Sequence, residues 1–258
     1  MLSGKIHTDN LRLDWSEAPW DSAIFESPVL QITSIEIGTN LEAAQRDSLS
    51  FIQARQSSSC YLVSCRIGAE KIREGFFLES FDFKFIEMVY HPYVTLGENN
   101  TNNNKHSRLT VARATTSSLE KMIAAAELSF GNERFHIDPR IPNQSANRRY
   151  ANWVKNSIQH PSQELYGIWD HDKLIAFFIT EDLPNDVCYW HLTAVFPEHQ
   201  GKGYGPEIWY TMMSHAWNRG CQTIKTCIAA RNYRVINLYA RTGFSFSAPL
   251  MTYHWMPQ

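Results

Sequence analysis

The sequence predicts an α/β protein, with helices packed in layers on sheets and a smaller α/β domain preceding a larger one. Strand-like and helix-like segments alternate through both halves of the chain, which favours helices packed in layers on a sheet. A polar, low-complexity run, Asn99–Asn104, separates the halves and is typical of a surface linker. A glycine-rich loop around Gly203 joins a strand-like segment to a helix-like one. We expect an N-terminal α/β domain over residues 1–97, a linker over 98–107 and a C-terminal domain over 108–258.

The N-terminal part begins with an aromatic-rich stretch that contains Trp15, Trp20 and Phe25. The apolar periodicity and the turn residues then predict, in order, strand Val29–Ile37, helix Leu41–Gln56, strand Cys60–Cys65, helix Glu70–Ser80 and strand Phe83–Tyr90. This part shows no catalytic constellation. We expect it to serve in packing, in dimerisation or as part of a substrate wall, and a homodimer is one expected arrangement.

The C-terminal part has clear helix signals. Ser117 or Ser118 is expected to cap a helix that ends near Phe130, and Gly220 and Gly243 are expected to end two later helices. The remaining expected elements are strand Leu109–Ala114, helix Ala146–Ile158, strands Glu164–Trp169, Leu174–Thr180 and Val187–Phe196, a helix ending at Arg219, strand Thr223–Ala229, helix Tyr233–Arg241 and strand Met251–Trp255.

Composition excludes several classes of function. The formal net charge is −2, so no global positive field draws the protein to nucleic acid or to an acidic membrane. The N-terminal residues lack the apolar run of a signal peptide, and no apolar stretch is long enough to span a bilayer. The five cysteines form no C-x-x-C pair and are expected to be reduced, buried thiols, which fits a cytoplasmic protein without a metal site.

The segment from Thr193 to Pro206 carries the strongest chemical signal. A strand runs into a loop with glycine at positions 201, 203 and 205, and a helix follows. Glycine lets the backbone approach a ligand closely, and the amides of the loop and of the helix N-terminus converge on one point. Pro206 suits the first turn of that helix. The spacing fits neither the dinucleotide fingerprint nor the phosphate loop of nucleotide triphosphatases. We therefore expect a site for phosphate or pyrophosphate, with Lys202 at its rim.

These residues resemble the GNAT acetyltransferase superfamily. Gln200-x-x-Gly203-x-Gly205 matches the family signature Q/R-x-x-G-x-G/A, and Asn232 to Phe244 resembles its second conserved block. The resemblance covers about residues 108–258 and implies the acyl-CoA N-acyltransferase fold with its mixed central sheet. It also implies that the N-terminal domain is a truncated half of the same kind. It implies acetyl-CoA as donor and co-substrate, and a gap between the strand ending near Phe196 and the strand Thr223–Ala229.

The resemblance also implies roles for individual residues. The donor's pyrophosphate would lie on Gln200, Gly201, Lys202, Gly203, Tyr204 and Gly205, and its pantetheine arm along Leu192, Thr193, Ala194 and Val195. Tyr239 would protonate the departing thiolate as general acid. Asn232 is expected to cap the helix that carries Tyr239 and to touch the arm of the donor.

The general base is left open by the sequence. Counting back by twos from Val195, one face of the strand carries Thr193, His191 and Tyr189, with no carboxylate. His191 is the favoured candidate because imidazole titrates near neutral pH. Glu181 and Asp182, at the end of the preceding strand, are the alternatives. We expect direct attack of the amine on the thioester in a ternary complex, with no covalent enzyme intermediate.

A second resemblance concerns the acceptor. Arg134-Phe135-His136-x-Asp138-Pro139, followed by Tyr150-x-x-Trp153, is similar to a subgroup of nucleotide-amino-sugar N-acetyltransferases that includes the dTDP-fucosamine acetyltransferase. It implies that Arg134 and His136 meet a sugar or its diphosphate and that Phe135 or Tyr150 forms an apolar wall. Two alternatives stay open: acetylation of a protein N-terminus or another small amine, and a non-catalytic acyl-CoA-binding module.

Overall fold

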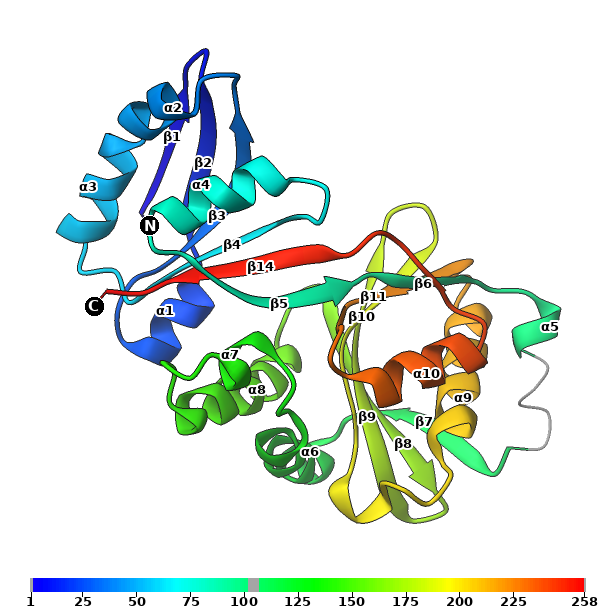
Figure 1. The fold of residues 1–258 in the computed structure, drawn as a ribbon. Helices are drawn as coiled ribbons and strands as arrows, with labels where there is room; N and C mark the ends of the chain where they lie inside the picture. The colour runs from blue at the N-terminus through cyan, green and yellow to red at the C-terminus, as the bar shows by residue number, and fades with distance from the viewer. Residues whose placement is uncertain (1, 102–106, 258) are drawn as a thin grey trace. The chain divides into compact units, whose positions relative to one another are not determined.

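The computed structural model describes residues 2–101 and 107–257 and divides the chain into two compact units. Unit 1 comprises the residues up to Val89 and those from Ala248 onward, and unit 2 comprises Tyr90–Ser247. Each unit is built on its own mixed sheet (Figure 1). The predicted mixed α/β fold is therefore confirmed.

Within unit 1 the strands follow the order β1-β2-β3-β4-β14-β5. The strands are β1 (Ser3–His7), β2 (Leu11–Glu17), β3 (Val29–Ile37), β4 (Leu62–Gly68), β14 (Leu250–Trp255) and β5 (Lys84–Tyr90). The helices are α1 (Pro19–Phe25), α2 (Leu41–Asp47), α3 (Leu49–Ser57) and α4 (Ile72–Ser80). The single helix predicted over 41–56 is two helices, because Ser48 ends the first and its hydroxyl donates to the carbonyl of Gln45 at 2.7 Å.

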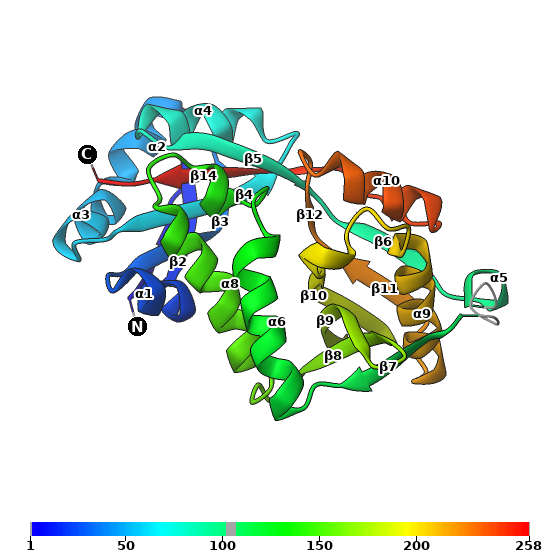
Figure 2. The ribbon, with the colours of Figure 1, turned by 90° about the horizontal axis from the view of Figure 1, so that it is seen from below.

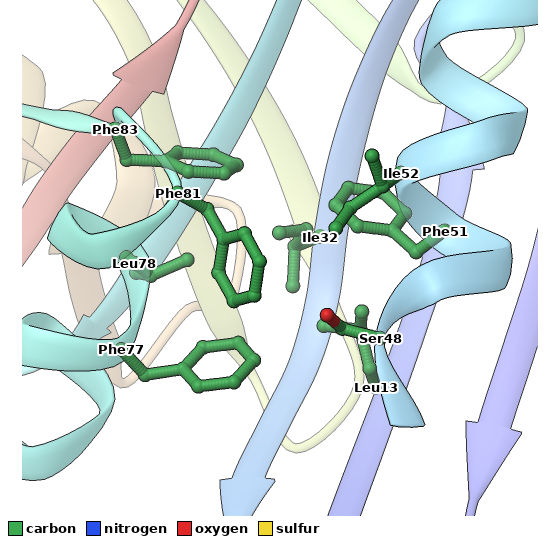
Figure 3. A pocket seen from close by; sticks show the side chains of 9 residues that line it. All are labelled: Leu13, Ile32, Ser48, Phe51, Ile52, Phe77, Leu78, Phe81 and Phe83. Carbon is green, nitrogen blue, oxygen red and sulfur yellow. The ribbon is translucent and has the colours of Figure 1, made fainter. Parts of the chain in front are cut away.

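The core of unit 1 lies between its sheet and the helices α3 and α4. Figure 3 shows nine side chains around a cavity of about 10 Å³, of which only Ser48 is polar. A space this small and apolar is a packing gap that excludes water. We assign it a structural role.

The sheet of unit 2 has the strand order β13-β6-β11-β10-β9-β8-β7. The strands are β13 (Ser245–Phe246), β6 (Pro92–Thr95), β11 (Thr223–Thr226), β10 (Val187–Val195), β9 (Lys173–Leu183), β8 (Gln163–Asp170) and β7 (Leu109–Arg113), and a two-residue strand, β12 (Ile228–Ala229), follows β11. Strands β8 and β9 form the predicted hairpin.

Helices cover both faces of this sheet. The helices are α5 (Glu98–Thr101), α6 (Thr116–Ser129), α7 (Arg134–Ile137), α8 (Asn143–Ser157), the 3-10 turn η2 (Pro197–His199), α9 (Gly205–Asn218) and α10 (Tyr233–Arg241). Helices α6 and α8 pack on one face, and α9 and α10 pack on the other (Figure 2). The cap of α6 is Thr115, which forms a reciprocal capping box with Ser118, so the predicted cap residue Ser118 occupies the third position of the helix instead.

The predicted domain boundaries differ from the observed units at both ends. Strand β6 pairs with β11 and so belongs to unit 2, although the prediction placed it before the linker. Strand β14 pairs with β4 and β5 and so belongs to unit 1, although the prediction placed it in the C-terminal domain. Each sheet thus receives one strand from a distant part of the sequence. Of the predicted linker, 98–101 form α5, and 102–106 lie outside the described residues.

Candidate active site

The sheet of unit 2 opens between β10 and β11. The two strands run parallel and pair from Val187–Thr223 to Trp190–Thr226, and within the described residues no rung follows. At this last pair, the hydroxyl of Thr226 donates to the carbonyl of Trp190 at 2.8 Å. Beyond it, residues 191–195 of β10 do not pair with β11. Ligands of open sheets bind outside the carboxyl ends of parallel strands, so this gap is a candidate site.

A β-bulge at His191 decides which way the side chains around the gap point. The register of β10 against β9 shifts between Trp190 and Leu192, so His191 is the extra residue. Trp190 packs with the α9–α10 face, whereas Leu192 and His191 turn to the α6–α8 face. Thr193 faces Tyr239 on the α9–α10 side. The sequence count by twos, which put His191 and Thr193 on one face, was therefore wrong, because the bulge breaks the alternation.

His191 forms a close pair with Glu181. Its Nε2 atom lies 2.7 Å from a carboxylate oxygen of Glu181, and each side chain is 21% exposed. Hydrogen bonding from Ser162, and then from His191, lowers the pKa of Glu181, so this carboxylate is charged at neutral pH. The sequence offered His191 and Glu181 as alternative bases. The structure brings them together, with Glu181 placed to orient the ring.

Asp182 points to the opposite face. Neighbouring residues of a strand alternate between faces, so Asp182 lies on the α9 side, where it forms an ion pair with Arg219. Arg219 also lies 3.0 Å from Glu164. Asp182 is thus separated from His191 by the sheet, which removes it as a candidate base.

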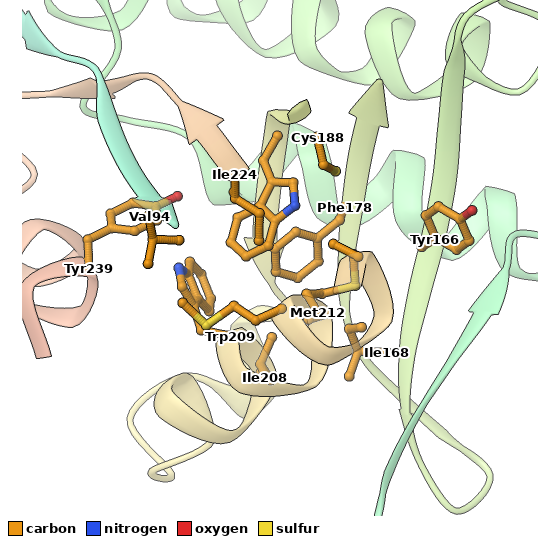
Figure 4. Close-up of a cluster of buried hydrophobic side chains, with 14 of the residues drawn as sticks. Val94, Tyr166, Ile168, Phe178, Cys188, Ile208, Trp209, Met212, Ile224 and Tyr239 are labelled. Atoms are coloured by element: carbon orange, nitrogen blue, oxygen red, sulfur yellow. The ribbon is translucent and has the colours of Figure 1, made fainter. Parts of the chain in front are cut away.

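Tyr239 lies on the α9–α10 face at the apex of the gap, the point after Trp190 and Thr226 where β10 and β11 diverge. Its side chain is 2% exposed and packs against Trp209 (Figure 4). It also packs against Phe244. Burial raises the pKa of Tyr239 to about 12, and interactions with Thr226 and Thr193 partly offset this. These two threonines belong to the two strands that diverge here. The phenol is therefore protonated at neutral pH and is close to both edges of the gap.

The glycine loop has the backbone that the sequence predicts. Gly201 and Gly203 have φ of +73° and +84°, values that favour glycine. Among the described residues, no acceptor takes a hydrogen bond from the N–H groups of Gly201, Lys202 or Gly203. The side chain of Gln200 donates to the carbonyl of Val195 at 2.9 Å and ties the loop to the end of β10. Free amides and the N-terminus of α9 fit an anionic group here.

Two residues near the loop differ from expectation. The Tyr204 hydroxyl donates to Asp170 at 2.7 Å, and Arg108 lies 3.1 Å from the same carboxylate, so this tyrosine side chain has a structural partner. Asn232 precedes α10, but its side chain makes no capping hydrogen bond, which corrects the predicted cap. Its backbone carbonyl instead accepts from the N–H groups of Val235 and Ile236.

Comparison with known proteins identifies the domain that contains these features. Residues 119–244 match the Acetyltransferase (GNAT) family. These residues form a GNAT acetyltransferase domain.

Relatives of this GNAT domain are distant. The chain is 26% identical over 158 residues to dTDP-fucosamine acetyltransferase of Escherichia coli, which covers 60% of this chain and 65% of that protein. It is 23% identical over 138 residues to the spore coat polysaccharide biosynthesis protein SpsD of Bacillus subtilis, which covers 54% of this chain and 47% of SpsD. The matches thus span about half to two thirds of the relatives' lengths.

A solved structure agrees in fold. A GCN5-related N-acetyltransferase from Sphaerobacter thermophilus matches 96% of this chain and 76% of its own, with a TM-score of 0.63 and 11% identity.

Across the described residues, no helix has both the length and the apolar character needed to cross a membrane.

The four candidate acceptor residues lie together in the GNAT domain: three are on α7, and Tyr150 is in the middle of α8. Phe135 and Tyr150 are 1% and 5% exposed, so both are core residues and neither forms an open wall. His136 stacks on Tyr150 with ring centroids 5.5 Å apart, and its Nε2 atom lies 2.8 Å from the Asn147 side-chain oxygen. The guanidinium of Arg134 lies 4.5 Å from the centre of the Phe135 ring.

Two residues of α8 extend this cluster. Trp153, half-buried, has its ring centroid 6.1 Å from that of His191, and its indole N–H donates to Gln163 at 3.2 Å. Arg149 lies over Phe135, Tyr150 and Trp153, between 4.5 and 5.4 Å from each ring centre. The sequence quoted Trp153 only as part of a motif and did not consider Arg149. The helical spacing of Arg149 and Trp153 was the available signal.

One group of possible metal ligands occurs among the described residues: Asp182, Cys188 and Cys221, whose ligand atoms lie within 4.8 Å of one another. Burial raises the pKa of the Cys188 thiol to about 12 and also raises that of Cys221. Both thiols are therefore protonated, and the ion pair of Asp182 with Arg219 places a positive charge beside them. These features disfavour a cation.

Proposed function

We propose that this protein is an N-acetyltransferase that transfers acetyl from acetyl-CoA to a primary amine. The observation that carries the proposal is the gap beyond Trp190 and Thr226. The glycine loop lies at the end of its β10 edge, Tyr239 at its apex, and the His191–Glu181 pair at the bulge where it opens.

The residues fit acetyl-CoA as the donor. The N–H groups of Gly201, Lys202 and Gly203 would hold its pyrophosphate, since they have no acceptor among the described residues. The free edge of β10 over 191–195 would pair with the amides of the pantetheine arm, in the way that an added strand pairs with a sheet edge. The acetyl group would then lie near the apex.

In the proposed reaction, His191 serves as base and Tyr239 as acid. His191, oriented by Glu181, takes a proton from the amine as the amine nitrogen attacks the thioester carbonyl. The new N–C bond forms and the C–S bond breaks. Tyr239 gives its proton to the departing thiolate; solvent then removes the proton from His191 and returns one to Tyr239. The high pKa of Tyr239 keeps it protonated and suits it to an acid and not to a base.

The gap lets His191 and Tyr239, which lie on opposite faces of the sheet, act on the same thioester. His191 faces α8, whereas Tyr239 lies on the other face of the sheet, and an intact sheet would separate them. Because β10 and β11 diverge after Trp190, a thioester between the strands is accessible from both faces. The amine would approach from the α8 side and the thiolate would leave on the α10 side. Positioning is then the main catalytic contribution.

We propose a nucleotide-linked amino sugar as the acceptor, with cytoplasmic activity and no metal. Support comes from the name of the E. coli relative and from the position of the motif residues. Trp153 links the His191 pair to the cluster of Arg134, His136 and Arg149, which offers cations and aromatic rings beside the proposed base. Such groups suit a sugar ring and a diphosphate.

The test is an acceptor screen. Thiol release from acetyl-CoA would be followed with nucleotide-linked amino sugars, free amino sugars, polyamines and peptides with free N-termini. The proposal predicts turnover with a nucleotide-linked amino sugar and its loss in His191→Ala. Turnover with peptides alone would overturn the acceptor assignment, and no thiol release with any amine would overturn the activity.

A further inference from the structure

Unit 1 repeats the strand arrangement that forms the gap in unit 2. The order β2-β3-β4-β14-β5 has the same directions as β9-β10-β11-β6-β13: an antiparallel pair, a parallel pair, then a strand antiparallel to its neighbours. In both units helices join the parallel pair. In both, the strand beside the second parallel strand comes from a distant part of the sequence: β14 beside β4, and β6 beside β11.

The repeat extends to single residues. The parallel pairing of β3 with β4 ends at Ile32 and Cys65, and the register of β3 against β2 shifts so that Thr33 is the extra residue. In unit 2 the pairing ends at Trp190, and His191 is the extra residue. In both units, therefore, the bulge directly follows the last paired residue of the same strand. Unit 1 has its own gap between β3 and β4.

This second gap contains a cavity. Its volume is about 170 Å³, and residues 32–35 of β3, residues 65–68 of β4 and Lys71 line it. A cavity of about 150 Å³ is enough for a ligand the size of benzene. The edges of two diverging strands present backbone groups suited to an amide. The ammonium of Lys71 donates to the carbonyl of Ile35 at 3.2 Å, and an ammonium has three donors in all.

The chemistry of the proposed active site is missing from unit 1. Thr33 stands where unit 2 has His191, and α4 contains no tyrosine. The turn from β3 to α2 lacks the glycine loop. Its Gly38 has no positive φ, and the carbonyls of Gly38 and Thr39 accept from Arg73. The second gap therefore suits binding without acyl transfer, and its ligand lacks a pyrophosphate.

We propose that the gap between β3 and β4 is a second binding site, for a small carboxylate that carries an amide, of the size of an N-acylated amino acid. The amide pairs with the free strand edges, and the carboxylate meets Lys71. Arg66, which also lines the cavity, is held by Thr252 at 3.1 Å and by Glu87 at 3.4 Å. Lys71 is thus the cation placed for the ligand, and Glu70, whose carboxylate lies beside Gly68, opposes it.

The test uses the full chain and N-acetylglycine as the probe, with binding measured by calorimetry. We expect saturable binding that Lys71→Met weakens by about tenfold or more, that Lys71→Arg retains and that Glu70→Gln strengthens. Lys5→Met removes an exposed lysine of β1 and should have no effect. N-acetylglycinamide, which lacks the carboxylate, and acetate, which lacks the amide, should bind more weakly. A melting curve for each variant confirms that it is folded.

Three results would overturn the proposal. They are the absence of binding to the wild type, equal binding to folded Lys71→Met, and displacement of N-acetylglycine by coenzyme A in simple competition. The last result would place the probe in the gap of unit 2. Loss of the proposed acetyltransferase activity in His191→Ala leaves this binding unchanged, so the two proposals fail separately.

Discussion

The pair formed by His191 and Glu181 gives the most specific prediction about activity. Glu181→Gln keeps a side chain of the same length within hydrogen-bonding reach of His191 but removes the negative charge 2.7 Å from the ring. A hydrogen bond to a charged group contributes about 1.5–3 kcal/mol, and the 21% exposure of both side chains moves the expected value to the low end. A loss of about 1–2 kcal/mol corresponds to a fall in kcat/KM of roughly 5- to 30-fold.

The assay is initial-rate thiol release, with acetyl-CoA varied at saturating acceptor and acceptor varied at saturating acetyl-CoA. Because Glu181 acts through His191, the loss should appear in kcat and leave the KM for acetyl-CoA unchanged. Asp182→Asn is the matched control: it neutralises the next carboxylate of β9, whose partner is Arg219 on the other face. We expect this control to lower the unfolding free energy while changing kcat less than twofold.

Either of two results would refute this reasoning. Full activity in Glu181→Gln would show that the charge beside His191 has no part in catalysis. An equal loss in Asp182→Asn would show that both variants act by general weakening of β9.

Further predictions concern the donor site, the acid and the acceptor helix. Tyr239→Phe should lower kcat at least tenfold and spare acetyl-CoA affinity, measured by calorimetry; equal loss of both would make Tyr239 structural. Gly203→Ala should raise the KM for acetyl-CoA and lower stability by about 1 kcal/mol in denaturant unfolding, because φ is +84°. Trp153→Ala should raise the acceptor KM with little change in the donor KM; the reverse pattern would contradict its position beside His191. Since burial raises the pKa of Tyr239 to about 12, the wild type should lose no turnover from tyrosine ionisation below about pH 10, whereas an alkaline loss absent from Tyr239→Phe would contradict this.

The glycine loop shows what the sequence alone could predict. The positions of Gly201 and Gly203 predicted a backbone that only glycine adopts easily, and both have positive φ. The strand before the loop and the helix after it were predictable because their apolar periodicity is strong. These features are local, so short-range rules capture them.

The missed features depend on contacts between distant residues. The bulge at His191 is a property of the pairing of β10 with β9, and no residue type announces it. For the same reason the sequence treated His191 and Glu181 as alternatives, although ten positions apart they meet across two strands. The sequence pattern also failed to predict that β6 pairs in the sheet of unit 2 and β14 in that of unit 1. Alternating residues predict a strand but not the strand with which it pairs.

Burial was the other source of error. The resemblance to the amino-sugar subgroup implied that Phe135 or Tyr150 forms an apolar wall for the acceptor. In the structure they face the core, and the cations Arg134 and Arg149 cover them. A periodic pattern gives the apolar face of a helix but not whether a ligand or a neighbouring element covers it.

A crystal structure with bound coenzyme A tests the central claim most directly. We expect the pyrophosphate on the amides of Gly201 to Gly205 and the pantetheine arm along β10 from Leu192 to Val195, with the sulfur near the Tyr239 hydroxyl. Coenzyme A bound with its pyrophosphate away from the loop, or with its arm outside the gap between β10 and β11, would contradict it.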